Sequence, residues 1–145
     1  MLRGLDSAAM REVLDLTGPE APVSRVGRLR HLGGALSRPP ALPNAVGHRG
    51  AEHLLSVISP LDGSDPGDAR SVHGRVIAAL APLTLGRCLN YMYGEKSTVE
   101  GVRTAYDADD YRRLAELKAV DDPANTFRFN HNIPPSDGRG LTVAG

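Results

Sequence analysis

Apolar residues recur every three or four positions in four stretches of the chain, a spacing that places them on one side of a helix. The clearest stretch follows Asp65 and Pro66, which are residues typical of a helix start. A capping-box sequence at residues 97–100 marks the start of another helix. The pattern predicts helices near residues 6–16, 66–81, 98–106 and 109–120.

Three short apolar runs have the length of β-strands, near residues 23–32, 53–59 and 87–92. In the third run, the alternation of a strand would place Cys88 and Asn90 on one face and Tyr91 on the other. Together with the helices, these runs predict an α+β fold in which helices pack on a partial antiparallel sheet. We expect an exposed sheet edge, which favours association.

Charge and composition narrow the class of protein. The 17 basic and 17 acidic side chains balance, so no net charge attracts nucleic acid or an anionic membrane surface. The longest apolar stretch, residues 76–85, is interrupted by Pro82 and is too short to cross a bilayer. Cys88 is the only cysteine, and the N-terminal residues do not follow a signal-peptide pattern, so we expect a cytoplasmic protein.

Generic catalytic motifs give little guidance. The five histidines have no spacing that places two on one helix face, and no second cysteine exists, so we predict no metal site. The pair Gly33 and Gly34 lacks the pattern of a nucleotide-binding loop and indicates a bend after a strand. Cys88 stands beside Arg87, which can activate a thiol, but a lone cysteine is more often a small packed side chain.

Two C-terminal stretches carry a more specific pattern. Residues 106–118 read Y-D-A-D-D-Y-R-R-L-A-E-L-K, and residues 122–135 read D-P-A-N-T-F-R-F-N-H-N-I-P-P. This sequence resembles the tail of the berberine-bridge-like FAD-dependent oxidases, approximately Y-x-x-N-Y-x-R-L-x-x-I-K-x-x-Y-D-P-x-N-x-F-R-x-N-Q-x-I-P-P. Residues 29–36 and 44–49 are similar to part of the substrate domain of bacterial members. The resemblance extends over about residues 2–135.

The resemblance implies an enzyme with an FAD-binding domain followed by a substrate domain that covers the flavin. This chain is similar only to the later part of the substrate domain and to the tail, and it has no counterpart of the pyrophosphate loop or the flavin attachment. It is therefore expected to be a truncated form. The expected organisation is a partial substrate domain (1–96), a berberine-bridge-like C-terminal helical segment and tail (97–135), and a disordered end (136–145).

The family motif Y-x-N-Y corresponds to residues 88–91 of this chain. By position, the resemblance implies that Asn90 contacts the flavin and that Tyr91 takes a proton from the substrate, while Cys88 replaces a tyrosine that contacts the flavin. A tyrosine acts as a base only if its pKa, ordinarily about 10, is lowered by positive charge or hydrogen bonds. The alternative is that Tyr91 packs its ring against the helix near residues 66–81.

Three functions stay open on the sequence. The first is the C-terminal substrate-domain segment of an FAD-dependent oxidoreductase, which oxidises an alcohol or amine by hydride transfer to flavin and is not active alone. The second is a non-catalytic module that binds a small molecule or another chain, and the third is a degenerate gene remnant. The expected partners are a small-molecule substrate and either a separate FAD-binding domain or a second copy bound through the sheet edge.

Overall fold

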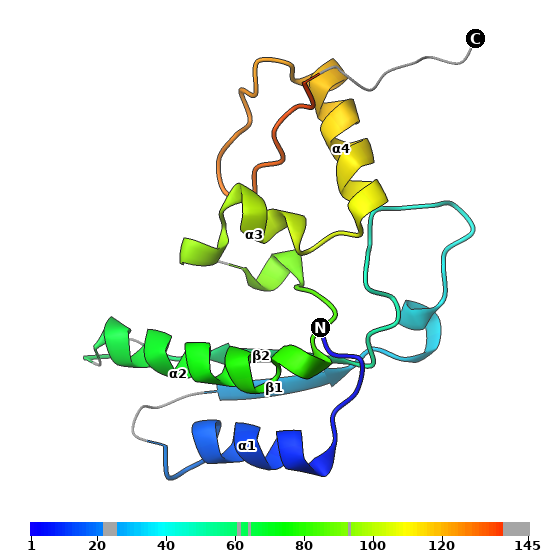
Figure 1. The fold of residues 1–145 in the computed structure, drawn as a ribbon. Coiled ribbons are helices and arrows are strands. Elements are labelled where there is room, and N and C mark those ends of the chain that lie inside the picture. Colours follow the sequence, from blue (N-terminus) through cyan, green and yellow to red (C-terminus); the bar gives the residue numbers. More distant parts are fainter. Residues whose placement is uncertain (22–25, 61, 64, 93, 138–145) are drawn as a thin grey trace. The chain divides into compact units, whose positions relative to one another are not determined.

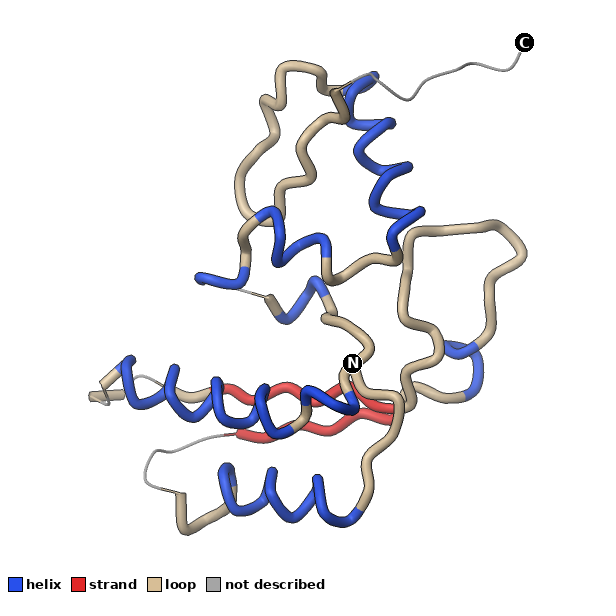
Figure 2. The backbone as a smooth tube through the Cα atoms, viewed as in Figure 1, coloured by secondary structure: helices blue, strands red, loops and turns tan. Residues whose placement is uncertain are grey.

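The computed structural model describes residues 1–21, 26–60, 62–63, 65–92 and 94–137. These residues form four α-helices and a two-stranded antiparallel sheet, which confirms the α+β class (Figures 1 and 2). The chain divides into two compact units: the first unit is Met1–Arg38 with Gly50–Leu85, and the second unit is Pro39–Arg49 with Gly86–Gly145. The separate functional boundary expected at residue 97 stays a prediction, and most of the expected disordered end, residues 138–145, lies outside the described residues.

The first unit contains two helices, α1 (Ser7–Thr17) and α2 (Pro66–Ala79). Each begins at an aspartate, because a carboxylate there accepts backbone N–H groups that have no partner inside the helix. Asp6 accepts a hydrogen bond from the N–H of Ala9 at 2.8 Å, and Asp65 accepts one from the N–H of Gly67 at 2.7 Å. These local contacts explain why both helices lie where the sequence predicts them.

The sheet consists of β1 (Val26–His31) and β2 (His53–Ile58), paired so that His31 lies opposite His53. Both strands are confirmed, although residues 23–25 of the first predicted strand lie outside the described residues. Leu2 forms isolated bridges with His53 and with Thr84, which the apolar pattern did not predict. The N-terminal end of the chain is thereby tied to β2.

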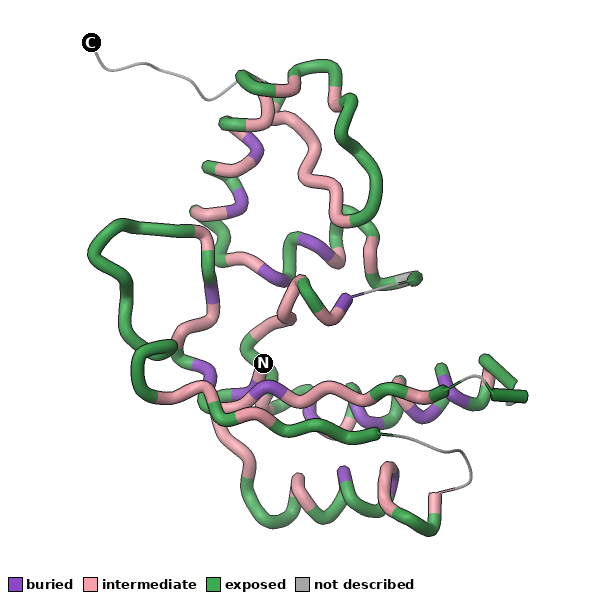
Figure 3. The backbone as a smooth tube through the Cα atoms, turned by 180° about the vertical axis from the view of Figure 1, so that it is seen from behind, coloured by how far each residue is buried: buried purple, intermediate pink, exposed green. Residues whose placement is uncertain are grey.

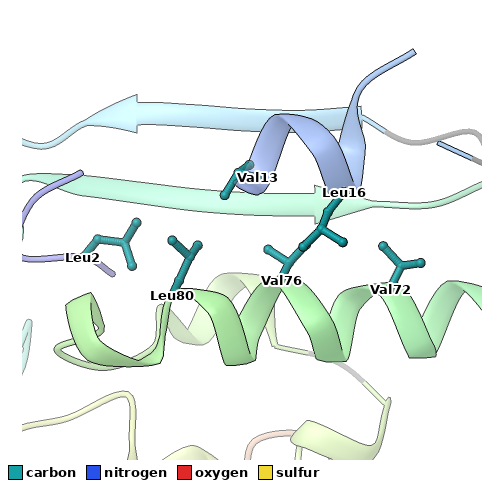
Figure 4. Close-up of a cluster of buried hydrophobic side chains, with 6 residues drawn as sticks. All are labelled: Leu2, Val13, Leu16, Val72, Val76 and Leu80. Atoms are coloured by element: carbon teal, nitrogen blue, oxygen red, sulfur yellow. The ribbon is translucent and has the colours of Figure 1, made fainter. Parts of the chain in front are cut away.

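The core of the first unit is a cluster of six buried aliphatic side chains, Leu2, Val13, Leu16, Val72, Val76 and Leu80. Figure 4 shows the three residues of the α2 stretch in one row, directed toward α1 and the strands. Their spacing of four residues keeps them on one side of the helix, as predicted. Leu55 and Val57, two residues apart on β2, pack against this cluster, as the alternation of a strand requires.

The second unit contains α3 (Val99–Arg103) and α4 (Ala108–Asp121). Thr98 caps α3 by accepting the N–H of Gly101 at 3.0 Å, so this helix begins where the sequence predicts it but ends before residue 106. Figure 3 shows buried positions of this unit on α3 and α4 and also in segments outside these helices. The buried aliphatic and aromatic residues are Met92, Val102, Ala105, Tyr111 and Ala115.

The third predicted strand, near residues 87–92, is wrong. Leu89–Tyr91 forms a 3₁₀ turn, in which the N–H of Tyr91 donates to the carbonyl of Cys88 at 3.0 Å. The N–H of Met92 donates to the carbonyl of Leu89 at 3.1 Å. A strand needs a neighbouring strand to accept its backbone hydrogen bonds, and in the described residues the sheet consists of β1 and β2 and includes no part of residues 87–92. The segment satisfies these groups locally instead.

None of the helices in the described part of the chain combines the length and the apolar character that a bilayer span requires.

Candidate functional site

The three residues singled out by the sequence motif lie together in one short segment, the 88–92 turn. Cys88 is extended at its start, and the 3₁₀ geometry then places Asn90 and Tyr91 on the turn itself. Asn90 is exposed, Cys88 and Tyr91 are partly buried, and Met92 is 4% exposed. The turn thus presents the Asn90 carboxamide outward while the side chain of Met92 anchors it in the second unit.

Residues before the 88–92 turn are held by the end of α3. The N–H of Arg87 donates to the carbonyl of Thr104 at 3.1 Å, and His48 Nε2 donates to the same oxygen at 3.0 Å. His48 Nδ1 lies 3.5 Å from Asp107 Oδ1. A Cβ on Gly86 would lie 2.1 Å from His48 Nε2, so only glycine leaves room for the imidazole ring here. The sequence did not single out His48, because nothing local links it to residue 104.

Residues after the 88–92 turn are held by the C-terminal tail. His131 Nε2 lies 2.7 Å from the carbonyl oxygen of Met92. Ser97 Oγ lies 3.5 Å from that oxygen and 3.4 Å from His131 Nε2. The 88–92 turn is therefore fixed on both sides by residues that are distant along the chain.

The tail itself is anchored to α4 through Asp122. Its carboxylate forms an ion pair with Lys118. The carboxylate also accepts hydrogen bonds from the N–H groups of Thr126 at 2.8 Å and Phe127 at 3.0 Å. Lys118 Nζ donates a further hydrogen bond to the carbonyl of Phe127 at 2.8 Å. The hydrogen bond from Lys118, followed by those from the two backbone groups, lowers the pKa of Asp122 to about 2. Asn125 has a φ of 51°, which turns the chain at this point.

Two phenylalanines of the tail remain uncovered. Phe127 is 80% exposed and Phe129 is 79% exposed, although large aromatic side chains usually lie in a core or an interface. Lys118 Nζ lies 6.0 Å from the centre of the Phe127 ring, and the Arg128 guanidinium lies 5.6 Å from that of Phe129. The tail thus presents an apolar surface with cationic groups beside it.

A comparison with family models identifies the segment that contains both the turn and the tail. Residues 89–134, about a third of the chain, match the family described as berberine and berberine like. These residues form a berberine-like segment. The family that these residues match is one of FAD-linked oxidases. No curated protein matched the chain in a sequence search.

The berberine-like segment confirms the resemblance of the C-terminal residues. It includes Asn90 and Tyr91, and it begins one residue after Cys88. The roles that the resemblance implies for these three residues stay predictions, as does the likeness of residues 29–36 and 44–49 to a substrate domain.

The described residues fit one end of FAD better than the other. The exposed carboxamide of Asn90 offers both donors and an acceptor, and the edge of a flavin ring also carries both. A phosphate group, by contrast, binds at helix N-termini that lack negative charge. All four described helices have acidic residues in the cap or first turn, Asp6 in α1, Asp65 and Asp68 in α2, Glu100 in α3, and Asp109 and Asp110 in α4. The Asn90 carboxamide thus suits hydrogen bonds to a flavin ring, while the described α-helix starts are poorly suited to a pyrophosphate.

Proposed function

We propose that this chain is the C-terminal substrate-domain part of an FAD-dependent oxidoreductase that oxidises an alcohol or an amine of a small molecule. The observation that carries the proposal is the berberine-like segment, because it includes Asn90 and Tyr91 in one turn that is held on both sides. The exposure of Asn90 on that turn supports contact with a flavin ring.

In the proposed reaction, the carbon of the substrate loses a hydride and its O–H or N–H group loses a proton, which leaves a C=O or C=N double bond. Bound FAD supplies the hydride acceptor. Tyr91 is the base that takes the proton from the substrate oxygen or nitrogen. Asn90 would orient the flavin ring through its carboxamide, and Cys88 would contact the ring without the stacking area of the tyrosine that it replaces.

We further propose that residues 1–145 do not hold FAD alone and that the FAD-binding domain lies outside them. The acidic helix starts support this, because they disfavour a pyrophosphate. The exposed Phe127 and Phe129 support a protein surface that covers the tail. A surface of this kind buries the two rings and places acidic groups near Arg128.

The first test is a titration of purified residues 1–145 with FAD, followed by flavin fluorescence and by absorbance after gel filtration. We expect no stoichiometric retention of flavin. A yellow protein with one FAD per chain would show that the chain needs no separate FAD-binding domain.

The second test assembles the chain with the FAD-binding domain of a berberine-like oxidase and measures oxidation of a panel of alcohols and amines. We expect turnover that Tyr91→Phe abolishes. Tyr106→Phe is the matched control, because Tyr106 is also a partly buried tyrosine of the second unit but lies outside the 88–92 turn. Equal turnover of the two variants would rule out Tyr91 as the base.

A third test concerns the tail. Replacement of both Phe127 and Phe129 by alanine is expected to weaken binding of the FAD-binding domain without changing the stability of the isolated chain, because both rings are already exposed. Val120→Ala is the control, since Val120 is a 70% exposed side chain of α4. Unchanged binding of the double variant would show that the partner does not cover the tail.

A second candidate function is a non-catalytic interaction module, and Cys88 is the observation that favours it. A thiol offers neither the ring nor the hydroxyl of the tyrosine in the family motif, so this position is not adapted to flavin. A stable complex with the FAD-binding domain that shows no turnover, and no gain on Cys88→Tyr, would favour this function. Restored turnover in Cys88→Tyr would favour an enzyme weakened at one contact.

Association of two copies is the remaining proposal for a partner. In the described residues β1 pairs with β2 alone, and its apolar residues Val26 and Leu29 are 52% and 40% exposed. A strand with one neighbour offers backbone groups to another strand. Light scattering after gel filtration tests this, and a monomer over the whole concentration range would exclude it.

A further inference from the structure

The imidazole of His131 makes a contact that the proposed chemistry does not use. Its Nε2 lies 2.7 Å from the carbonyl oxygen of Met92, across 39 positions of sequence. A carbonyl oxygen can only accept, so Nε2 must carry the hydrogen in this bond. The Ser97 hydroxyl lies near both atoms, 3.5 Å from the oxygen and 3.4 Å from Nε2.

Met92 is restrained through both of its backbone polar groups. Its N–H closes the 3₁₀ turn by donating to the carbonyl of Leu89 at 3.1 Å, and its carbonyl accepts from His131. Its side chain is 4% exposed. Since Met92 directly follows Tyr91, any movement of the Met92 backbone also moves Asn90 and Tyr91.

The local backbone explains how His131 reaches the turn. Asn130 has a φ of 61°, in the left-handed region where asparagine is among the few residues tolerated. The N–H of Asn132 donates to the carbonyl of Asn130 at 3.0 Å, which closes a tight turn around His131. The partly buried His131 side chain thereby leaves the tail and reaches Met92 and Ser97.

We propose that His131 is a positioning residue, which holds the C-terminal side of the 88–92 turn so that Asn90 and Tyr91 keep one orientation. The catalytic part of this inference rests on the function proposed above. The structural part does not, because it concerns a hydrogen bond within residues 1–145. The two parts are tested by separate measurements.

The structural part is tested by amide hydrogen exchange of the full chain, measured by NMR. His131→Leu keeps an apolar body of similar size and removes the donor to the Met92 carbonyl. The Met92 amide keeps its own bond to Leu89, so its exchange reports how often the turn opens. If the turn loses the stabilisation of one hydrogen bond, this exchange is expected to rise about three- to tenfold. The Val102 amide is the internal reference, because it is bonded to the carbonyl of Thr98 at 2.8 Å. It is expected to keep its rate.

Two further variants keep the test decisive if His131→Leu does not fold. His131→Gln places an N–H donor at a similar reach and is expected to restore slow exchange at Met92. His131→Asn carries the same carboxamide on a shorter side chain and is expected to exchange as fast as the leucine variant. Unchanged exchange at Met92 in the asparagine variant, or an equal acceleration at Val102, would overturn the positioning role.

The catalytic part is tested in the enzyme assembled with an FAD-binding domain. His131→Asn is expected to lower kcat severalfold with the amount of bound flavin unchanged, and His131→Gln is expected to recover it. If the assembled wild-type enzyme shows no turnover, the proposed function fails while the exchange result still stands. If turnover is present and all three proteins have equal kcat, the catalytic part of the inference is wrong.

Discussion

The burial of Val102 gives the sharpest quantitative prediction for the second unit. Its side chain is 0% exposed, whereas Val99, three residues earlier in the same helix, is 37% exposed. Replacing either residue by alanine removes the same two methyl groups and leaves a better helix former. The difference in unfolding free energy between the two variants therefore isolates the contribution of burial.

The expected magnitude follows from the number of carbons removed. Each buried carbon lost without refilling costs about 0.5–1.5 kcal/mol, so Val102→Ala is expected to lose about 2 kcal/mol. Val99→Ala is expected to lose less than about 1 kcal/mol, because part of the side chain already contacts water and no closed cavity forms. For a unit of this size, a difference of about 1 kcal/mol lowers the melting temperature by about 4–8 °C.

The assay is urea denaturation followed by tyrosine fluorescence. The chain has no tryptophan, and its four tyrosines, at positions 91, 93, 106 and 111, all belong to the second unit. The signal therefore reports unfolding of that unit, while far-ultraviolet circular dichroism reports both units. Equal losses for Val102→Ala and Val99→Ala would refute the burial assigned to α3 and the packing inferred around it.

Two further predictions concern the helices and the tail. The pKa of Asp122 is lowered to about 2 in the folded chain, so its carboxylate stabilises the fold above its ordinary pKa near 3.8 and this contribution is lost as the pH falls toward 2. The stability of Asp122→Asn, followed by circular dichroism as the pH is lowered, is expected to lack the loss that titration of Asp122 causes in the wild type. An acid-unfolding profile equal to that of the wild type would contradict the role of the Lys118–Asp122 pair. Gly101→Ala is expected to destabilise the chain, because the added Cβ would lie 2.1 Å from the carbonyl oxygen of Lys96. Gly74→Ala meets open space in α2 and is expected to stabilise it by about 0.5–1 kcal/mol in thermal unfolding, so equal signs for the two glycine variants would show the clash to be absent.

The predicted site residues Cys88, Asn90 and Tyr91 lie in a segment that the sequence predicts as a strand and the structure forms as a turn. The alternation of residues 87–92 is typical of a strand, but the structure forms a 3₁₀ turn whose backbone groups bond within the segment. The motif still brought Asn90 and Tyr91 together, because adjacent residues stay adjacent in any local structure. His131 and His48 were not predicted as supports, since their contacts join positions 39 and 56 residues apart.

What the sequence determined by itself is mainly local. Caps at Asp6 and Asp65, and apolar residues four apart in α2, specify helices through contacts within one or two turns. The berberine-like segment can also be identified from the sequence, because its tail matches the family pattern without a break.

The tertiary structure decided which residues that are distant along the chain contact one another. Only the folded chain places Leu2 in the core, divides the residues into two units and closes His131 onto Met92. The physical reason is that a backbone N–H or C=O group bonds to whichever partner the fold brings near it. The spacing of neighbouring residues in the sequence does not show which distant partner that is. The 88–92 turn closes through local hydrogen bonds, and long-range contacts at Arg87 and Met92 hold it on both sides.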